Sequence, residues 1–137
     1  YRTGIFQYDD DSWVDMYSSG ISSGNIYQFN TEIKHLNSTY KYHQIKVDKI
    51  ARISAATAQE MGLILLIIEP MNIYIYDVRK IDWKALKTIK QTEYKVEIDH
   101  SQGKAEYNHY IIPKSLAKKV INRAILSAGN TSGLKDN

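Results

Sequence analysis

Three side chains near the start of the chain could do chemistry together: Asp15, Glu32 and Lys34. Asp15 falls near the end of a predicted short strand over residues 13–17, and Glu32 and Lys34 fall in a predicted strand over residues 25–36. Because side chains along a strand repeat every two residues, Glu32 and Lys34 share one face. If the two strands form a hairpin, Asp15 faces Glu32 across it.

Two carboxylates that face each other repel, and burying each of them costs free energy. A divalent cation resolves this conflict, and oxygen ligands suit Mg²⁺ or Mn²⁺. The peptide carbonyl of Ile33 could add a further ligand. Such a metal lowers the pKa of a bound water and stabilises charge on a phosphate, while Lys34 could orient the attacking water or neutralise the developing charge. We therefore predict a metal site made by Asp15, Glu32 and Ile33.

The motif resembles that of the PD-(D/E)xK nuclease superfamily, which includes type II restriction endonucleases and Holliday-junction resolvases. It consists of Val14-Asp15, sixteen intervening residues and Glu32-Ile33-Lys34, with Val14 where the family has proline. In those enzymes a helix, a buried apolar strand and another strand follow the E-x-K strand. The predicted segments 40–61, 63–68 and 73–78 fill these places, so the resemblance covers about residues 10–80.

The chain looks closest to the small resolvase-like members of the RecU type, in which a glutamine on the helix after E-x-K often supports the site. Gln44 would be that residue. The resemblance implies a Mg²⁺- or Mn²⁺-dependent endonuclease that hydrolyses DNA, of the restriction or the junction-resolving type. It also implies four catalytic residues, which are Asp15, Glu32, Lys34 and Gln44. Cleavage of two strands usually needs two sites, so a homodimer is expected.

The elements that must position these residues are predicted from periodicity and turn signals. Strands are expected at 1–8, 13–17, 25–36, 63–68 and 73–78, a hairpin at 92–99 and 104–112, and helices at 40–61, 83–90 and 114–127. The long helix before the apolar strand is typical of a crossover in a mixed sheet. We predict an α/β or α+β fold with a central mixed sheet flanked by helices and, from the resemblance, a restriction-endonuclease-like core. Residues 1–128 would form one domain and 129–137 a flexible tail.

Basic residues gather on the first and last predicted helices, and the net charge is +3 from 18 Lys and Arg against 15 Asp and Glu. This balance permits a polyanion partner without requiring one. If the substrate is DNA, we expect one of two groups to contact phosphates near Lys34. The C-terminal group is the stronger candidate, because the long helix must also bury one face. The two groups are Lys46, Lys49 and Arg52, and Lys119 and Arg123.

Other kinds of site have little support among the 137 residues. Cysteine is absent, which excludes disulfides, thiolate zinc sites and a cysteine nucleophile. Nucleotide-cofactor fingerprints and the G-x-S-x-G elbow are missing, and the four histidines lack zinc-site spacing. The longest apolar run, 63–68, is too short to cross a bilayer, so we expect no membrane partner and a cytoplasmic protein.

Four alternatives stay open. The fold could serve a non-catalytic module that binds nucleic acid or protein, or the chain, which begins at Tyr1, could be a fragment of a larger enzyme. Glu32 and Lys34 could be a solvated pair on an edge strand, and one of Asp9, Asp10 and Asp11 could replace Asp15 as a ligand. The metal hypothesis requires the Asp15 and Glu32 carboxylates to approach within about 4–6 Å, as two oxygens bound to one ion do.

Overall fold

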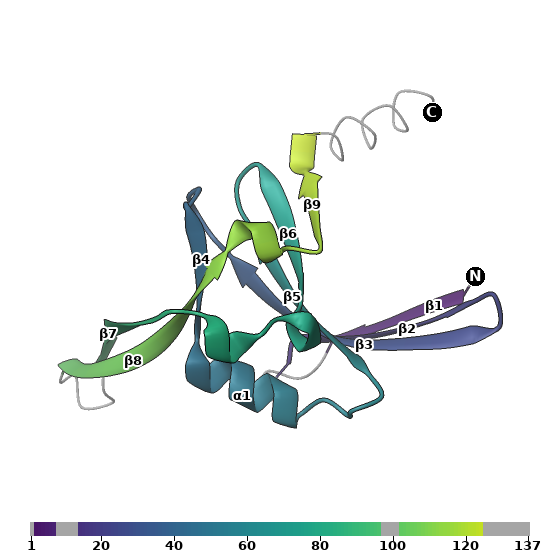
Figure 1. Cartoon of the computed structure of the whole chain (residues 1–137), viewed down its shortest axis with the longest axis horizontal. Helices are drawn as coiled ribbons and strands as arrows, with labels where there is room; N and C mark the ends of the chain where they lie inside the picture. The colour runs from purple at the N-terminus through teal and green to yellow at the C-terminus, as the bar shows by residue number, and fades with distance from the viewer. Residues whose placement is uncertain (1, 8–13, 97–101, 125–137) are drawn as a thin grey trace.

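The computed structural model of the chain describes residues 2–7, 14–96 and 102–124, which form two β-sheets and a single α-helix (Figure 1). The strands are β1 (Arg2–Gln7), β2 (Met16–Ser22), β3 (Asn25–His35), β4 (Tyr42–Lys46), β5 (Gly62–Ile68), β6 (Asn72–Asp77), β7 (Thr88–Val96), β8 (Gln102–Pro113) and β9 (Lys119–Asn122). The helix is α1 (Val47–Ala55), and three 3₁₀ turns are η1 (Val78–Lys80), η2 (Trp83–Ala85) and η3 (Lys114–Leu116).

The larger sheet is mixed and has the strand order β1-β2-β3-β5-β6-β9. β1, β2 and β3 form an antiparallel meander, whereas β3 and β5 run parallel, so the chain crosses over between them. The crossover carries β4 and α1, which confirms the predicted mixed sheet with a crossover. A second sheet has the order β4-β8-β7 and extends to the opposite side of the molecule from the meander (Figure 1).

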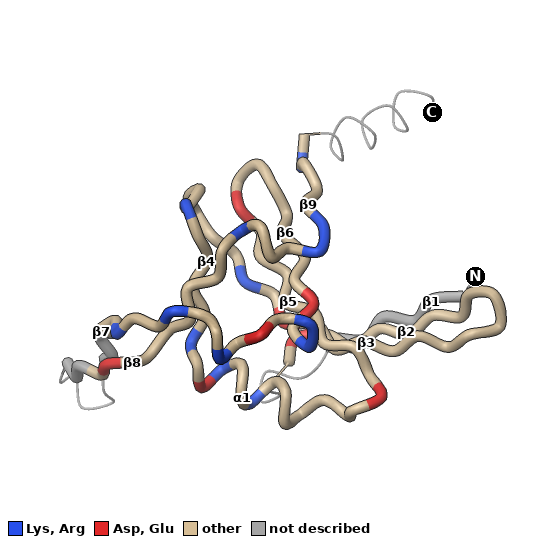
Figure 2. The backbone as a smooth tube through the Cα atoms, viewed as in Figure 1, with Lys and Arg blue, Asp and Glu red and all other residues tan. Residues whose placement is uncertain are grey.

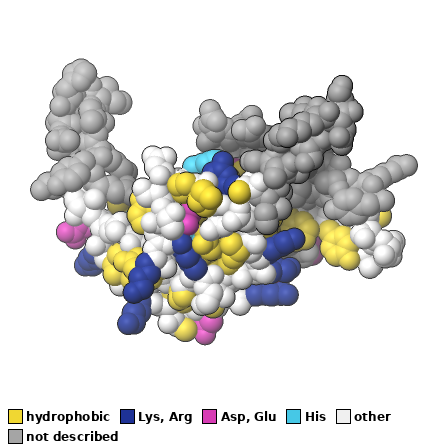
Figure 3. All heavy atoms as spheres, turned by 90° about the horizontal axis from the view of Figure 1, so that it is seen from above, with side chains coloured by type: hydrophobic (Ala, Val, Ile, Leu, Met, Phe, Trp, Pro, Cys, Tyr) yellow, Lys and Arg dark blue, Asp and Glu magenta, His cyan; other side chains and the backbone are white. Residues whose placement is uncertain are grey.

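The core lies between α1 and the larger sheet. Leu63, Leu65 and Ile67 of β5 are completely buried and belong to one apolar cluster with Ile50 and Ile53 of α1. The alternate residues of β5 are only half-buried, so the expectation of a strand buried on both faces is wrong. The face turned away from α1 shows hydrophobic side chains bordered by Lys and Arg (Figure 3).

The predicted helix over residues 40–61 is wrong at both ends. Its first part is β4, in which His43 and Ile45 are buried while the alternate side chains turn outward. This is a period of two, which suits a strand, and β4 pairs with β8. The helix itself spans nine residues, and after its end the carbonyls of Thr57 and Ala58 accept hydrogen bonds from Arg79 at 3.0 Å.

The predicted helices over 83–90 and 114–127 are also wrong, because only short 3₁₀ turns form at their beginnings. The chain after η3 instead adds β9 to the free edge of β6. The Lys118 amide donates to the Ile75 carbonyl at 2.7 Å and the Arg123 amide donates to the Met71 carbonyl at 2.8 Å. An available sheet edge that satisfies backbone groups thus overrides a local helical pattern.

The result is an α+β fold dominated by strands rather than a sheet flanked by several helices. No helix in the described part of the chain has the length and apolar character needed to cross a membrane. The predicted tail at 129–137 and the three aspartates at 9–11 lie outside the described residues.

A buried polar network joins β4 to the larger sheet. The imidazole of His43 lies 2.6 Å from Tyr76 Oη through Nδ1 and 2.6 Å from Glu69 Oε2 through Nε2. Lys114 Nζ completes the network at 2.9 Å from the same Glu69 oxygen. Burial lowers the pKa of His43. Burial would raise the pKa of Glu69, but the interactions with its partners, of which the Lys114 hydrogen bond is the largest, outweigh burial and lower the pKa of that carboxyl. The network therefore holds an ionised glutamate against a neutral histidine.

We expect Glu69→Ala to lower the free energy of unfolding by roughly 3 kcal/mol or more, because it leaves Lys114 and His43 without their buried partner. Asp48→Ala is the matched control, since it breaks an exposed Asp48–Arg52 ion pair and should cost less than about 1 kcal/mol. Urea denaturation of both variants at pH 7 measures the difference. Equal losses would show that the network is energetically neutral.

Candidate metal and phosphate site

Asp15 and Glu32 meet at the point where β2 begins beside β3. The Asp15 amide donates to the Thr31 carbonyl at 3.2 Å, and its Oδ2 accepts the Ile33 amide at 2.7 Å. These two bonds hold Asp15 against β3 on either side of Glu32. Each carboxyl shifts the pKa of the other, so the two side chains lie close enough to interact.

Glu32 points toward α1 because it aligns with the buried Leu65 in the parallel register of β3 on β5. Its side chain is 8% exposed, and Lys49 Nζ from α1 lies 3.0 Å from Oε2. That oxygen is buried, and the Lys49 ammonium is its partner in the described part of the chain. Glu32 is therefore a buried carboxyl that forms an ion pair with Lys49. It is not a solvated residue on an edge strand.

The two carboxyls have opposite pKa shifts. Burial, with the Asp15 carboxyl beside it, raises the pKa of Glu32 to about 7, although Lys49 acts against the rise. Burial also opposes ionisation of Asp15, but hydrogen bonds from Glu32 and from the Ile33 amide outweigh it and lower its pKa. Between the two shifted pKa values the pair therefore holds one proton. Such a pair is typical of a site built to hold a cation.

The donor set fits a hard divalent cation. Two carboxylates interact, the buried Oε2 of Glu32 is paired with the partly exposed Lys49, and Ile33 lines the same pocket as Glu32. No third His, Asp or Glu joins them within the described residues, so the peptide carbonyl of Ile33 and water would complete the shell. Lys49, with a side chain 39% exposed, is free to swing outward when a cation takes its place.

Lys34 shares a pocket with Glu32. The pocket has a volume of about 380 Å³ and is lined by Glu32, Ile33, Lys34, Ile45, Lys46, Lys49 and His109. Lys34 Nζ donates to the Gln44 carbonyl at 2.7 Å, which ties it to β4 across the pocket. Glu32 and Lys34 therefore line one space that is large enough for a phosphate group.

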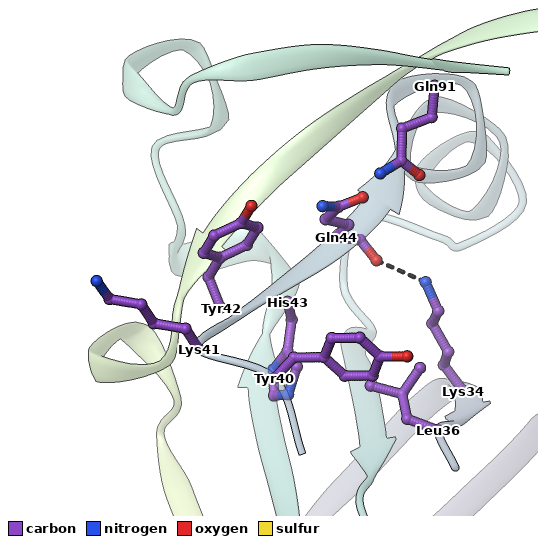
Figure 4. Close-up of a pocket in the computed structure, with 8 residues that line it drawn as sticks. All are labelled: Lys34, Leu36, Tyr40, Lys41, Tyr42, His43, Gln44 and Gln91. Carbon is purple, nitrogen blue, oxygen red and sulfur yellow. Dashed lines mark hydrogen bonds between the residues drawn. The ribbon is translucent and has the colours of Figure 1, made fainter. Parts of the chain in front are cut away.

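Gln44 differs from its expected position. It lies on β4 and not on a helix, and it pairs with Ile111 of β8. Its backbone carbonyl holds Lys34, while its side chain lines a neighbouring pocket (Figure 4). The structure therefore gives Gln44 a positioning contact with Lys34 and does not bring its amide into the carboxylate pocket.

The basic residues divide between the two expected groups. Lys46 and Lys49 line the carboxylate pocket, whereas Arg52 is exposed and paired with Asp48 at 3.0 Å. Lys119 lines a different pocket against Phe29 and Ile64, and Arg123 donates to the Glu69 carbonyl at 3.0 Å. The group that borders Lys34 thus belongs to β4 and α1, not to the C-terminal segment. Lys and Arg also mark α1, β4 and β7 along the tube, while the β2–β3 hairpin beyond the site carries none (Figure 2).

Two members of the pocket escaped the sequence analysis. Lys49 was expected only to contact DNA, yet it is the ion-pair partner of Glu32. His109, one of four histidines without metal-site spacing, lines the pocket and is 5% exposed. It reaches the site through the pairing of His109 with Lys46 across β4 and β8. The two-residue periodicity of residues 42–46 is the sequence signal that could have predicted this strand and so placed His109 at the site.

Comparison with known proteins gives no further assignment. Neither protein-family models, nor curated proteins, nor solved structures match this chain.

We expect Glu32→Gln to stabilise the metal-free protein at pH 8. The folded state binds the Glu32 proton more tightly than the unfolded chain does, so the stability from this group is present below pH 4.5 and is lost as the pH rises through about 7. A carboxyl pKa raised to about 7 corresponds to roughly 3 kcal/mol, an upper bound for the gain at pH 8. Thermal unfolding at pH 5 and pH 8 should show the gain only at pH 8.

The same variant should lose the increase in melting temperature that Mg²⁺ gives the parent, because one of two carboxylate ligands is gone. Glu60→Gln removes an exposed carboxylate elsewhere and is the matched control. A Mg²⁺ response that is equal in the parent and in Glu32→Gln would place the metal elsewhere.

Proposed function

We propose that this protein is a metal-dependent endonuclease that hydrolyses phosphodiester bonds of DNA. The observation that carries the proposal is the Asp15–Glu32 pair, whose buried member Glu32 shares one pocket with Lys34, Lys46 and Lys49. Carboxylates beside a lysine suit a cation and an anionic phosphate at the same time. Because a duplex has two strands to cut, a homodimer with one site for each strand is part of the proposal.

In this proposal Asp15, Glu32 and the Ile33 carbonyl hold Mg²⁺ or Mn²⁺. An ion held by these residues would supply a water of lowered pKa and compensate charge on the scissile phosphate. The Ile33 amide fixes the Asp15 carboxylate at 2.7 Å, so the ligand is oriented before any ion arrives. Lys34, held at 2.7 Å from the Gln44 carbonyl, lies where an ammonium neutralises the charge that grows on the phosphate as water attacks phosphorus.

The order of elements supports the resemblance to PD-(D/E)xK nucleases. The E-x-K strand β3 is followed by α1, by the apolar strand β5 and by β6. Asp15 stands at the start of the neighbouring strand β2. One feature differs from the expected pattern, since β4 is inserted before α1 and carries Gln44.

A second candidate is a nucleic-acid-binding module without catalysis. The ion pair between Lys49 and Glu32 favours it, because the ammonium already compensates the buried carboxylate without a metal. Among the described residues, the site also offers two carboxylates and no third His, Asp or Glu, which is a small set of ligands for a metal ion. The two candidates differ in one outcome, which is whether DNA is cut when Mg²⁺ is present.

We expect the parent to nick or linearise plasmid DNA with Mg²⁺ and not with EDTA, and we expect Lys34→Ala to cut at least about 100-fold more slowly. The variant loses the ammonium aimed at the phosphate, while the β3 backbone that carries it is unchanged. Lys84→Ala, an exposed lysine on η2, is the matched control and should cut like the parent. Equal rates for the parent and Lys34→Ala would move catalysis to another site, and no Mg²⁺-dependent cutting by the parent would favour the binding module.

The salt dependence of duplex binding should identify the basic surface that meets DNA. Lys46→Ala should lower the slope of log affinity against log salt by about one unit, because one phosphate contact is lost. Lys119→Ala, on the far edge strand β9, should leave the slope unchanged. Binding in Ca²⁺ across a salt series measures both, and the reverse result would place DNA over β9.

A further inference from the structure

A second pocket adjoins the carboxylate pocket, and Lys34 lines both. It has a volume of about 470 Å³ and lies at the start of β4. Its lining residues are Lys34, Leu36, Tyr40, Lys41, Tyr42, His43, Gln44 and Gln91. A polymer that places one phosphate at Lys34 can therefore extend its next unit directly into this space.

The lining has two exposed aromatic rings. Tyr40 is 49% exposed and Tyr42 is 39% exposed, whereas the next residue, His43, turns into the core and is 1% exposed. Strand β4 thus directs the His43 imidazole inward and the Tyr42 ring outward, and Tyr40 precedes the strand. Figure 4 shows both rings at the rim of the same space, with Tyr40 extending toward Lys34.

Two amide side chains face the rings. Gln44 from β4 and Gln91 from β7 both line the pocket, and in Figure 4 they lie on the side of the space opposite Tyr40. An amide offers one acceptor and two donors, which match the hydrogen-bonding edge of any base. Lys41 extends outward at the rim, where an ammonium can meet a backbone phosphate.

We propose that this pocket receives an unpaired nucleobase of the DNA strand whose neighbouring phosphate lies at Lys34. Flat aromatic rings beside a basic groove are how proteins hold single-stranded nucleic acid, since every base has a face that stacks. A base inside a continuous duplex is paired and stacked, so it enters such a pocket only after it is flipped out. The protein therefore prefers DNA with unpaired nucleotides beside the bound phosphate over an uninterrupted duplex.

This inference rests on the proposed function, because DNA must pass Lys34 for its next base to reach Tyr40 and Tyr42. It adds a substrate preference that the carboxylate pocket alone does not give. The aromatic residues make that preference independent of base sequence, because stacking tolerates every base.

The test compares two labelled DNAs in Ca²⁺, which blocks cleavage: a blunt duplex of 20 base pairs and the same duplex with a four-nucleotide single-stranded overhang. The parent should bind the overhang DNA roughly tenfold more tightly than the blunt duplex, the range expected for one stacked base. Tyr40→Ala with Tyr42→Ala should bring this ratio close to one. Tyr27→Ala, an equally exposed tyrosine on the distant β2–β3 hairpin, should keep the parent ratio.

A parent ratio near one overturns the inference, and so does a double variant that keeps the parent ratio with a native circular dichroism spectrum. If the double variant does not fold, Tyr40→Ser and Tyr42→Ser tested singly replace it, and each must lower the ratio. Plasmid cutting in Mg²⁺ by the parent reports on the proposed nuclease separately. A protein that cuts but shows no preference loses only this inference, and one that shows the preference but does not cut loses only the nuclease.

Discussion

The parallel register of β3 on β5 is the constraint on which the site depends. It aligns Glu32 with Leu65 and so turns the glutamate toward α1 and the buried side of the sheet. A slip of one residue would move Glu32 to the opposite face and end its contacts with Asp15 and Lys49. The same register lets Asn30 Nδ2 donate a hydrogen bond to Thr57 Oγ1 at 2.9 Å, just after α1. This bond holds the end of the crossover against β3. The apolar side chains of β5 therefore hold Glu32 in a buried environment, where ionising its carboxyl costs free energy.

Burial explains why a bound cation would stabilise this site. A carboxyl whose pKa is raised to about 7 is destabilising when it ionises, and a metal ion turns that cost into binding free energy. Lys49 compensates part of the charge, but from a half-exposed side chain that can move away. The His43–Glu69 network works differently, since its charges are already matched by Lys114 and it holds β4 in place. The charges of one polar cluster are thus matched inside the core, whereas the other relies on the partly exposed Lys49 to compensate a buried carboxyl.

Much of the larger sheet could be predicted, because β3, β5 and β6 have strong strand patterns and a crossover must join the parallel pair. The convergence of Asp15 and Glu32 followed from that order. The helices could not be predicted, because their extents depend on distant partners. Residues 42–46 become a strand by pairing with β8, and residues 119–122 by pairing with β6. Lys49 and His109 reach the site only through those pairings, and no local pattern of charge marks either residue as its neighbour.

The central claim is that the Asp15–Glu32 pair is a divalent cation site at the mouth of a phosphate pocket. Anomalous scattering from crystals of the protein grown with Mn²⁺ tests it most directly. The account predicts an anomalous peak within about 2.0–2.4 Å of an oxygen from each carboxylate, with Lys49 moved away from Glu32. A peak elsewhere, or an intact contact between Lys49 and Glu32 with no peak at the pair in saturating Mn²⁺, would contradict it.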